Sequence, residues 1–264
     1  MVVVADNLGR LLREHRYLYG VICRDTTLTD IELMAQTGYH IVWIDLEHSS
    51  QPIGETVKLC RTITHLGMAP LVRIVELSRS NVQPLVDGGV QIVALPDVRS
   101  VAAAAELVRL TKYPPVGERG VSTTNAGIGF HFGSDRQETL RKANDAVYPM
   151  VMFESDEGYK ELEEILSIED VAIVTTGAMD WSTSLGFSEE KAKNYLTPMI
   201  DRVIRATTEA GKIAAIGAGS PEQAQHFVNL GVRMIFVGVD VAMKRKALID
   251  SLCKFQNTIE SSHI

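Results

Sequence analysis

Eight short apolar runs, spread along the chain, most constrain what this sequence can fold into. They are rich in Val, Ile and Leu and lack the polar alternation of a half-exposed strand, which indicates strands buried on both faces of a parallel sheet. The expected strands cover residues 19–23, 40–46, 69–73, 91–95, 146–153, 171–175, 213–216 and 233–238. Each is followed by a segment with helical character. Eight such units in 264 residues predict one (β/α)8 barrel domain over residues 1–264.

The expected helices lie before and between these strands, at residues 8–16, 29–37, 53–66, 81–86, 101–110, 135–144, 158–166, 189–209, 221–230 and 241–258. Pro198 predicts a break in the longest internal helix, and Pro149 weakens the fifth strand. Residues 113–132, YPPVGERGVSTTNAGIGFHF, interrupt the rhythm with Pro, Gly and Thr. An irregular segment of this length inside a compact fold is typical of a functional loop.

A doubly wound open sheet is the main alternative to the barrel. That fold places a glycine-rich phosphate-binding turn directly after its first strand. Here the first strand is followed by Arg24, Asp25, Thr26 and Thr27, without a glycine. The barrel is therefore favoured.

Composition and charge exclude several classes of partner. The net charge is −7 and no run of Lys or Arg occurs, which argues against nucleic acid. No apolar run approaches the roughly 20 residues of a membrane helix, and the first residues do not resemble a signal peptide. Cys23, Cys60 and Cys253 match no metal-binding spacing. We therefore expect a soluble cytoplasmic protein with reduced thiols that acts on a small molecule.

Charged residues gather where the expected strands end. Residues 41–50, IVWIDLEHSS, begin as an apolar strand and end in Asp45, Glu47 and His48. Later strands are followed by further charged residues, namely Arg73, Asp97, Glu154, Asp180 and Asp240. The chemistry of such barrels lies at the carboxyl ends of the strands. Because buried charges are costly unless paired or metal-bound, we expect these side chains to share one site.

Glu154 and Asp180 come from different strands and suit a hard divalent cation. Mg²⁺ commonly takes one or two carboxylates and leaves other positions to water and substrate oxygens. The lack of a His or Cys cluster argues against a dedicated zinc site. On their own, however, the two residues could equally be salt-bridge or capping carboxylates.

The remaining rim residues offer groups for anion binding and proton transfer. Arg73 can provide a fixed fork for a carboxylate or enolate oxygen, or can simply extend from the rim into solvent. His48 is a possible general acid and base, with Asp45 orienting it, or a structural histidine. Asp87 is a weaker candidate for the same orienting task, because it falls in a helix rather than at a strand end.

Several blocks resemble one enzyme family. IDLEHSS, at residues 44–50, resembles the IDxEH motif of the HpcH/HpaI aldolases, the metal-dependent class II pyruvate aldolases. The similarity continues in order through PLVRI, VDGGVQIVALPDVRS, YPPVGERGVS, FESDEG, GAMDWSTSLG and LGVRMIFVGVD. Together these blocks span nearly the whole chain and are far more specific than any one of them.

The resemblance implies a role for each matched residue. Glu154 and Asp180 would hold the divalent cation, Mg²⁺ first, with Mn²⁺ or Co²⁺ as alternatives. His48 would be the acid and base, and Arg73 the residue that binds the enolate oxygen. The other implied residues are the supporting acids Asp45 and Asp87, and Ala178 and Met179, whose backbone amides would hold the pyruvate carboxylate. The family also implies a barrel whose last helix is exchanged between subunits of a homo-oligomer, a hexamer or trimer.

The sequence departs from the family pattern near the expected substrate. Met152 stands at a substrate-contacting position where the family has Gln, and Leu46 and Ala178 replace Gly and Pro. Residues 214–223 also differ from the family's substrate loop. The cation and enolate residues are retained, whereas those that choose the second substrate are altered.

The predicted function is cleavage of a 4-hydroxy-2-oxoacid to pyruvate and an aldehyde through a metal-stabilised enolate. A second interpretation is an oxaloacetate-using decarboxylase or condensing enzyme, such as the citrate-forming enzymes of siderophore pathways, and the loss of Gln at Met152 favours it. A third is a barrel that binds a 2-oxoacid without catalysis.

Overall fold

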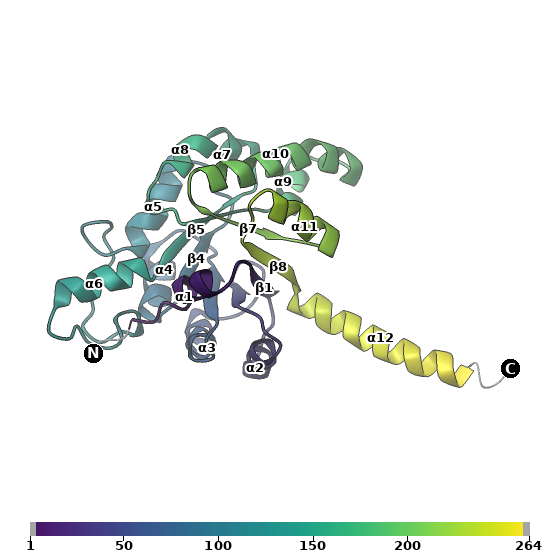
Figure 1. Cartoon of the computed structure of the whole chain (residues 1–264), viewed down its shortest axis with the longest axis horizontal. Helices are drawn as coiled ribbons and strands as arrows, with labels where there is room; N and C mark the ends of the chain where they lie inside the picture. The colour runs from purple at the N-terminus through teal and green to yellow at the C-terminus, as the bar shows by residue number, and fades with distance from the viewer. Residues whose placement is uncertain (1–3, 261–264) are drawn as a thin grey trace.

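The computed structural model describes residues 4–260 and shows a closed barrel of eight parallel strands in the order β1 to β8 (Figure 1). The strands are β1 (Leu18–Cys23), β2 (Ile41–Asp45), β3 (Ala69–Arg73), β4 (Ile92–Leu95), β5 (Tyr148–Phe153), β6 (Ile173–Thr176), β7 (Ile213–Gly217) and β8 (Met234–Val239). The predicted (β/α)8 fold is confirmed.

Helices connect the strands around the outside of the barrel. They are α1 (Asn7–Glu14), α2 (Leu28–Gln36), α3 (Ile53–His65), α4 (Arg79–Asp87), α5 (Val101–Thr111), α6 (Arg136–Asp145), α7 (Asp156–Lys160), α8 (Leu162–Leu166), α9 (Ala178–Ser184), α10 (Glu189–Glu209), α11 (Pro221–Asn229) and α12 (Asp240–Glu260). The long loop contains one short 3-10 turn, η1 (Ala126–Ile128).

Three helical predictions need correction. The helix expected at 158–166 is two short helices, α7 and α8, which meet at Glu161. Helix α9 was not predicted, because among its residues Trp181 alone is buried and no apolar stripe marks it. Helix α10 is not broken at Pro198. Pro198 and Asn194 are both exposed, so the carbonyl that the proline leaves without a donor can bond to water.

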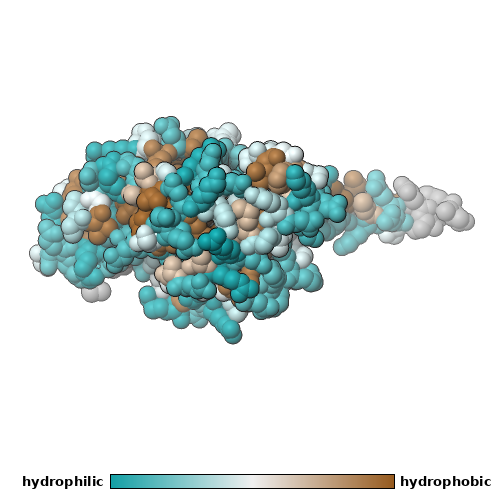
Figure 2. Space-filling view, turned by 90° about the horizontal axis from the view of Figure 1, so that it is seen from above, coloured by the Kyte–Doolittle hydropathy of each residue, from teal (hydrophilic) through white to brown (hydrophobic). Residues whose placement is uncertain are grey.

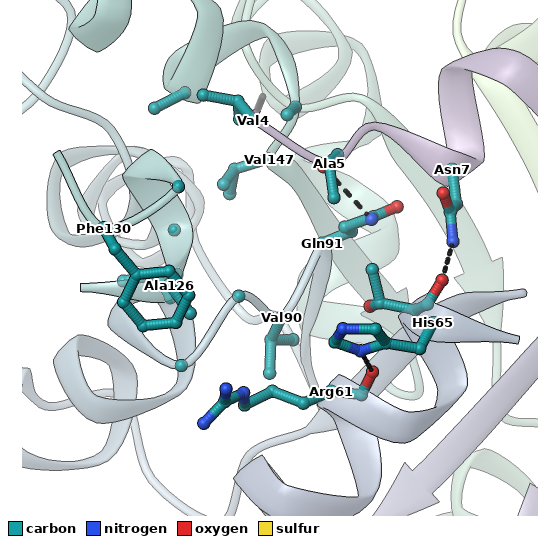
Figure 3. Close-up of a pocket in the computed structure, with 18 of the residues that line it drawn as sticks. Val4, Ala5, Asn7, Arg61, His65, Val90, Gln91, Ala126, Phe130 and Val147 are labelled. Atoms are coloured by element: carbon teal, nitrogen blue, oxygen red, sulfur yellow. Dashed lines mark hydrogen bonds between the residues drawn. The ribbon is translucent and has the colours of Figure 1, made fainter. Parts of the chain in front are cut away.

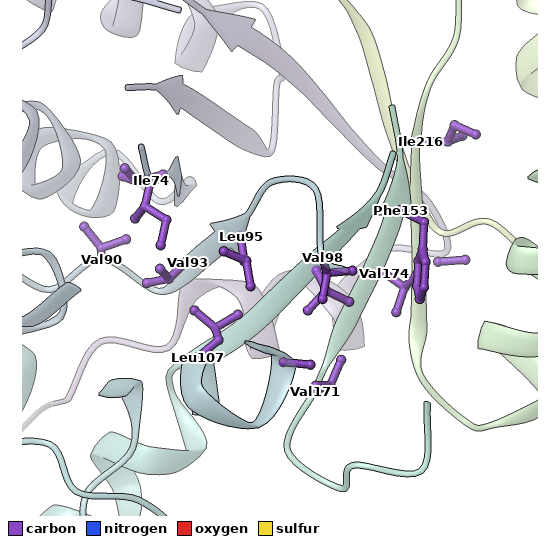
Figure 4. Close-up of a cluster of buried hydrophobic side chains, with 14 of the residues drawn as sticks. Ile74, Val90, Val93, Leu95, Val98, Leu107, Phe153, Val171, Val174 and Ile216 are labelled. Atoms are coloured by element: carbon purple, nitrogen blue, oxygen red, sulfur yellow. The ribbon is translucent and has the colours of Figure 1, made fainter. Parts of the chain in front are cut away.

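Two apolar cores explain why the strands lack polar alternation. Side chains that point into the barrel, such as Trp43, Met152 and Phe236, form an inner cluster. Their neighbours along the same strands, such as Phe153 and Val174, point outward and pack under the helices (Figure 4). Both faces of the sheet are therefore buried, as in other parallel sheets.

Strand register brings the predicted site residues to one edge of the barrel. Asp45 and Arg73 are paired residues at the ends of β2 and β3. Glu154 directly follows β5 and continues the inward series of Met150 and Met152. The carboxyl ends of the strands therefore carry these three charged side chains toward the same opening.

Helix α12 extends away from its own barrel (Figure 1). All of its side chains from Val241 to Ile259 are exposed, including Leu252 and Phe255. Figure 2 shows hydrophobic residues on the part of this helix that lies beyond the barrel. Within residues 4–260, no helix is both long enough and apolar enough to span a bilayer.

Candidate active site

A buried ion pair between Arg73 and Asp45 forms the centre of one side of the site. The guanidinium Nε lies 2.9 Å from Asp45 Oδ1, and Nη2 lies 2.6 Å from Oδ2. The Asp45 side chain is fully buried, and that of Arg73 is 7% exposed. Two parallel hydrogen bonds of this kind fix the plane of the guanidinium as well as its position.

Two further residues join this pair. Glu47 Oε2 lies 2.9 Å from Arg73 Nη1, and Arg24 Nε lies 3.4 Å from Asp45 Oδ2. Glu47 had no predicted role, although a carboxylate two residues after Asp45 at the end of the same strand is a signal that it shares the site. Arg24 was considered only as part of a turn without glycine. Both residues belong to one charge network around Arg73.

This network holds its groups in the charged form. Burial alone would raise the pKa of Asp45, but hydrogen bonds and charge from Arg73 lower that pKa below its usual range. Burial likewise opposes the charge of Arg73, but Asp45 and Glu47 raise its pKa. Because each charge has a partner, the pair can remain ionised in a buried place.

The structure places His48 differently from the prediction. Its side chain is 44% exposed, and Nε2 lies 3.9 Å from Glu47 Oε2. Asp45 does not contact the imidazole. Asp45 Oδ1 instead accepts hydrogen bonds from the backbone N–H groups of Glu47 (3.1 Å) and His48 (3.3 Å). The turn after β2 thus uses the Asp45 carboxylate to bind backbone, and a role for Asp45 in orienting the imidazole remains a prediction.

Glu154 forms the opposite side of the site and is incompletely paired. It is 5% exposed, and its Oε2 accepts the backbone N–H of Asp97 at 2.8 Å. Its Oε1 is buried and has no hydrogen-bond partner among residues 4–260. Burial, with added repulsion from Asp180 and Glu47, raises the pKa of Glu154 to about 7. A buried carboxylate oxygen without a donor is costly, so this position suits a cation or another donor.

The surroundings of Glu154 are shaped to keep that oxygen free. A Cβ atom at Gly177 would lie 1.8 Å from Oε1, so any side chain at this position would displace the carboxylate. Asp97, whose amide holds the other oxygen, has a φ of 40°. The left-handed region costs a residue with a side chain about 1–2 kcal/mol. Neither feature was predicted, because both depend on backbone geometry rather than on residue pattern.

Asp180 and the predicted anion-binding amides lie at the start of α9. Asp180 is an exposed residue in the first turn, and its charge reaches Glu154. Gly177 precedes the helix and provides no side-chain cap. No described group accepts a hydrogen bond from the amides of Ala178 or Met179, as expected at an uncapped helix start. The Met179 side chain itself is 80% exposed.

These residues suit a hard divalent cation. Glu154 and Asp180 offer oxygen ligands, and the free Oε1 together with the space kept by Gly177 provides a place for an ion. Within residues 4–260, no group of three or more His, Cys, Asp and Glu side chains could hold a metal.

Asp87 does not join the other predicted residues within one chain. It is the last residue of α4, which leads into the amino end of β4, whereas the site lies at the carboxyl ends of the strands. Its Oδ1 accepts hydrogen bonds from Arg119 Nη2 (2.8 Å) and Asn125 Nδ2 (3.2 Å). In this chain it fastens the 113–132 loop, and a catalytic role for it remains a prediction.

A cavity of about 520 Å³ lies near Asp87, at the amino ends of β4 and β5 (Figure 3). Val90 and Gln91, just before β4, and Val147, just before β5, line it together with Arg61 and Phe130. None of the charged residues at the carboxyl ends of the strands lines this cavity. Since barrel enzymes place their chemistry at the other end, we do not assign the active site to it.

Sequence comparison places this site in a known family. A profile of the HpcH/HpaI aldolase/citrate lyase family matches residues 25–247, which include Asp45, Arg73, Glu154 and Asp180.

The chain belongs to the HpcH/HpaI aldolase/citrate lyase family.

Curated relatives in the HpcH/HpaI family match over nearly full length. The hydroxypyruvate/pyruvate aldolase of Delftia acidovorans is 30% identical over 98% of this chain and 95% of its own. The 2-keto-3-deoxy-L-rhamnonate aldolase of Escherichia coli is also 30% identical, over 93% of this chain and 91% of its own. Among solved structures, an HpcH/HpaI aldolase from Desulfitobacterium hafniense DCB-2 has a TM-score of 0.87 at 24% identity, covering 94% of this chain and 96% of that one.

Two departures from the HpcH/HpaI pattern occupy different places. Met152 is 4% exposed and belongs to the inner cluster, on the same strand and face as Glu154. Leu46 belongs to the outer cluster and packs away from the barrel interior. Met152 therefore places an apolar side chain beneath the site, and an effect of either residue on the choice of second substrate remains a prediction.

Proposed function

We propose that this barrel is a metal-dependent carbon–carbon lyase that cleaves a 4-hydroxy-2-oxoacid to pyruvate and an aldehyde. Two groups in the same site carry the proposal. Arg73 has a guanidinium held in place by Asp45, and Glu154 has one buried carboxylate oxygen without a hydrogen-bond partner. The aldolase names of the curated relatives support the same reaction class. The arrangement combines an anion-binding group with a cation-binding group at one opening.

Arg73 is placed to bind the oxygen on which negative charge develops. A guanidinium has five N–H groups, and the contacts with Asp45 and Glu47 use three of them. The two that remain can donate to a substrate oxygen. Because Asp45 holds the group in place beforehand, little reorganisation is needed when the enolate forms.

Glu154 and Asp180 would hold the divalent cation, with Mg²⁺ as the proposed ion and Mn²⁺ or Co²⁺ as alternatives. When bound, the cation supplies positive charge beside the oxygen of the forming enolate. The amides of Ala178 and Met179 would bind the substrate carboxylate, since an uncapped helix start offers free N–H groups. Met152 would contact the substrate through its apolar side chain only.

His48 would transfer the proton. It accepts the proton of the 4-hydroxyl while the bond between C3 and C4 breaks, and the electron pair of that bond enters the enolate of pyruvate. Protonation of C3 then gives pyruvate. Glu47, close to both His48 and Arg73, is placed to stabilise the positive imidazolium. Asp45 supports this step through Arg73, and Asp87 would support it only from another subunit.

The last helix supports a homo-oligomer. A cavity of about 490 Å³ is lined by Tyr19 of β1, by Ile235 and Val237 of β8, and by residues of α11. Helix α12, with exposed Leu252 and Phe255, has an apolar face that such a groove could bury in another subunit. A hexamer or trimer built from whole 264-residue barrel domains, in the cytoplasm, is the assembly we propose.

The experiment compares the wild type with Arg73→Ala and Glu154→Ala. Each protein is supplied with Mg²⁺ and a set of 4-hydroxy-2-oxoacids, and pyruvate release is followed with a coupled lactate dehydrogenase assay. Both variants should lose at least 100-fold in kcat/KM, the scale of removing one transition-state contact. Turnover that survives both substitutions would refute the proposal.

Met152 favours oxaloacetate as an alternative substrate for the same residues. With an apolar side chain in place of the family's Gln, the enolate could come from oxaloacetate, by decarboxylation or by condensation with a thioester. Incubation with oxaloacetate, with and without acetyl-CoA, separates the two reactions. Release of free thiol would identify a condensing enzyme, and loss of oxaloacetate without thiol would identify a decarboxylase.

A further inference from the structure

Trp43 has a buried hydrogen-bond donor that nothing in the described chain uses. It points into the barrel from β2, two residues before Asp45, and is 4% exposed. Its indole Nε1 is buried and has no acceptor among residues 4–260. Trp181, the other tryptophan, is also buried but donates to Asp156 Oδ1 at 2.7 Å. An unused buried donor costs about 1–3 kcal/mol, so this exception needs a cause.

The indole lies directly beneath the charged groups of the site. The guanidinium carbon of Arg73 is 6.0 Å from the ring centroid, at the rim side. The ring of Phe236 meets the indole edge-on, with centroids 4.8 Å apart. Met152 belongs to the same inner cluster. Trp43 therefore forms part of the floor between the Arg73 network and the strand that carries Glu154.

Packing of Phe236 between Gly20 and the indole holds the indole in position. A Cβ atom at Gly20 would lie 2.6 Å from the Phe236 ring, so Phe236 rests against backbone that has no side chain. Phe236 in turn supports the edge of Trp43. The indole is therefore held in place rather than free to turn toward another acceptor.

The neighbours of the indole cannot satisfy it. The hydrophobic residues of the inner cluster have aliphatic, aromatic or thioether side chains, and no described residue accepts a hydrogen bond from Nε1. A guanidinium has no acceptor, and a thioether sulfur is a weak one. The indole lies two residues before Asp45 on β2 and 6.0 Å from the Arg73 guanidinium carbon, so it borders the opening in which the proposed reaction places substrate oxygens.

We infer that the indole N–H of Trp43 donates a hydrogen bond to an oxygen of the bound 2-oxoacid and is a substrate-binding residue of this enzyme. The inference rests on the proposed function and deepens it. Because an indole can donate but not accept, it selects an oxygen with free lone pairs, such as a keto or carboxylate oxygen, over a protonated amine.

The test uses the two indole ¹⁵N–H signals of the full-length, Mg²⁺-loaded protein, with pyruvate as the probe. Trp43→Phe assigns one signal by its loss, and Trp181→Phe assigns the other if the first variant does not fold. On saturation with pyruvate, the Trp43 signal should move downfield and exchange more slowly with water, while the Trp181 signal stays in place. A Trp43 signal that does not move while pyruvate saturates the site would overturn the inference.

Kinetics provide a second readout. Trp43→Phe keeps an aromatic ring but removes the donor, and we expect KM for the 2-oxoacid to rise about tenfold, the scale of one hydrogen bond. Met150→Leu, one layer deeper in the same inner cluster, is the matched control for repacking and should leave KM unchanged. Equal KM values for wild type and Trp43→Phe would contradict the inference while leaving the lyase intact. A wild type that neither binds pyruvate nor releases it would instead refute the proposed function.

Discussion

The two sides of the site handle buried charge in opposite ways. On the β2 and β3 side, Asp45 and Arg73 neutralise each other, and the pKa of Asp45 falls below its usual range despite burial. On the β5 and β6 side, Glu154 has one backbone donor and one oxygen without a partner, and burial raises its pKa to about 7. The first side is complete within the chain. On the second side, Glu154 Oε1 obtains a partner only when a cation or another donor binds.

The largest effect is expected from changing Glu154, on the incompletely paired side, to Gln. The variant keeps the size and the Oε2-type acceptor but removes the charge that a cation needs. We expect turnover in Mg²⁺ to fall by about 1,000-fold or more. Because the amide also removes a carboxylate that is costly to bury, thermal denaturation at pH 8 without divalent cation should show no loss of stability. Near-normal turnover by this variant would show that Glu154 is not the cation ligand.

The matching change on the other side is Asp45→Asn. It leaves the Arg73 charge buried with a weaker partner, so the free energy of unfolding should fall by about 3–5 kcal/mol, measured by urea denaturation. The double variant Asp45→Asn with Arg73→Met removes both charges and should recover part of this loss. If the single variant were as stable as the wild type, Arg73 and Asp45 would not be the closed pair described here.

The pH dependence of the two sides has opposite sign. The folded protein keeps the Glu154 proton up to pH about 7, whereas an unfolded chain releases it near 4.5, so the folded state loses stability as pH rises through this window. The loss is on the order of 3 kcal/mol, from 1.4 kcal/mol per pKa unit. Asp45 has a lowered pKa, so its stabilisation is present above its usual pKa and is lost as pH falls.

The pH dependence of cation affinity should follow the pKa of Glu154. Because proton and cation compete for the same carboxylate, the affinity for Mn²⁺ or Mg²⁺ should fall about tenfold per pH unit below 7 and level off above it. Calorimetric titration between pH 5.5 and 8.5 measures this. The Glu154→Gln variant serves as its control and should show no such slope. A flat affinity in the wild type would contradict the raised pKa.

A smaller effect is expected at Gly177. In Gly177→Ala the added methyl would meet Glu154 Oε1, so the carboxylate must shift, and Mn²⁺ affinity should fall about tenfold. The φ of Gly177 is −112°, so the cause is steric rather than conformational. Gly54→Ala, where a Cβ meets nothing within 4 Å, is the control and should leave Mn²⁺ affinity unchanged. Equal Mn²⁺ affinities in both variants would show that the space beside Glu154 Oε1 is not needed for cation binding.

The barrel and the residues on its rim could be predicted from the sequence because they follow from strand periodicity. Apolar runs marked the strands, and a spacing of two along each strand carried Asp45 and Glu154 to the inner face. Parallel register then placed Arg73 beside Asp45. These features depend on pattern alone.

Features that depend on local backbone geometry could not be predicted. The turn after β2 brings the backbone N–H of His48 to the Asp45 carboxylate, and the left-handed Asp97 brings its amide to Glu154. The unused donor of Trp43 became visible only once its neighbours were known to be apolar. Sequence pattern predicts which face a side chain occupies, whereas its partners depend on the conformation of turns and on the packing around it.

The most direct test of this account measures pyruvate release from 4-hydroxy-2-oxoacids after the protein has been freed of metal with a chelator and then titrated with Mg²⁺. The incomplete Glu154 side predicts no turnover without cation and full recovery when Mg²⁺, or Mn²⁺ or Co²⁺ in its place, is restored. Full turnover in the presence of excess chelator would contradict the account.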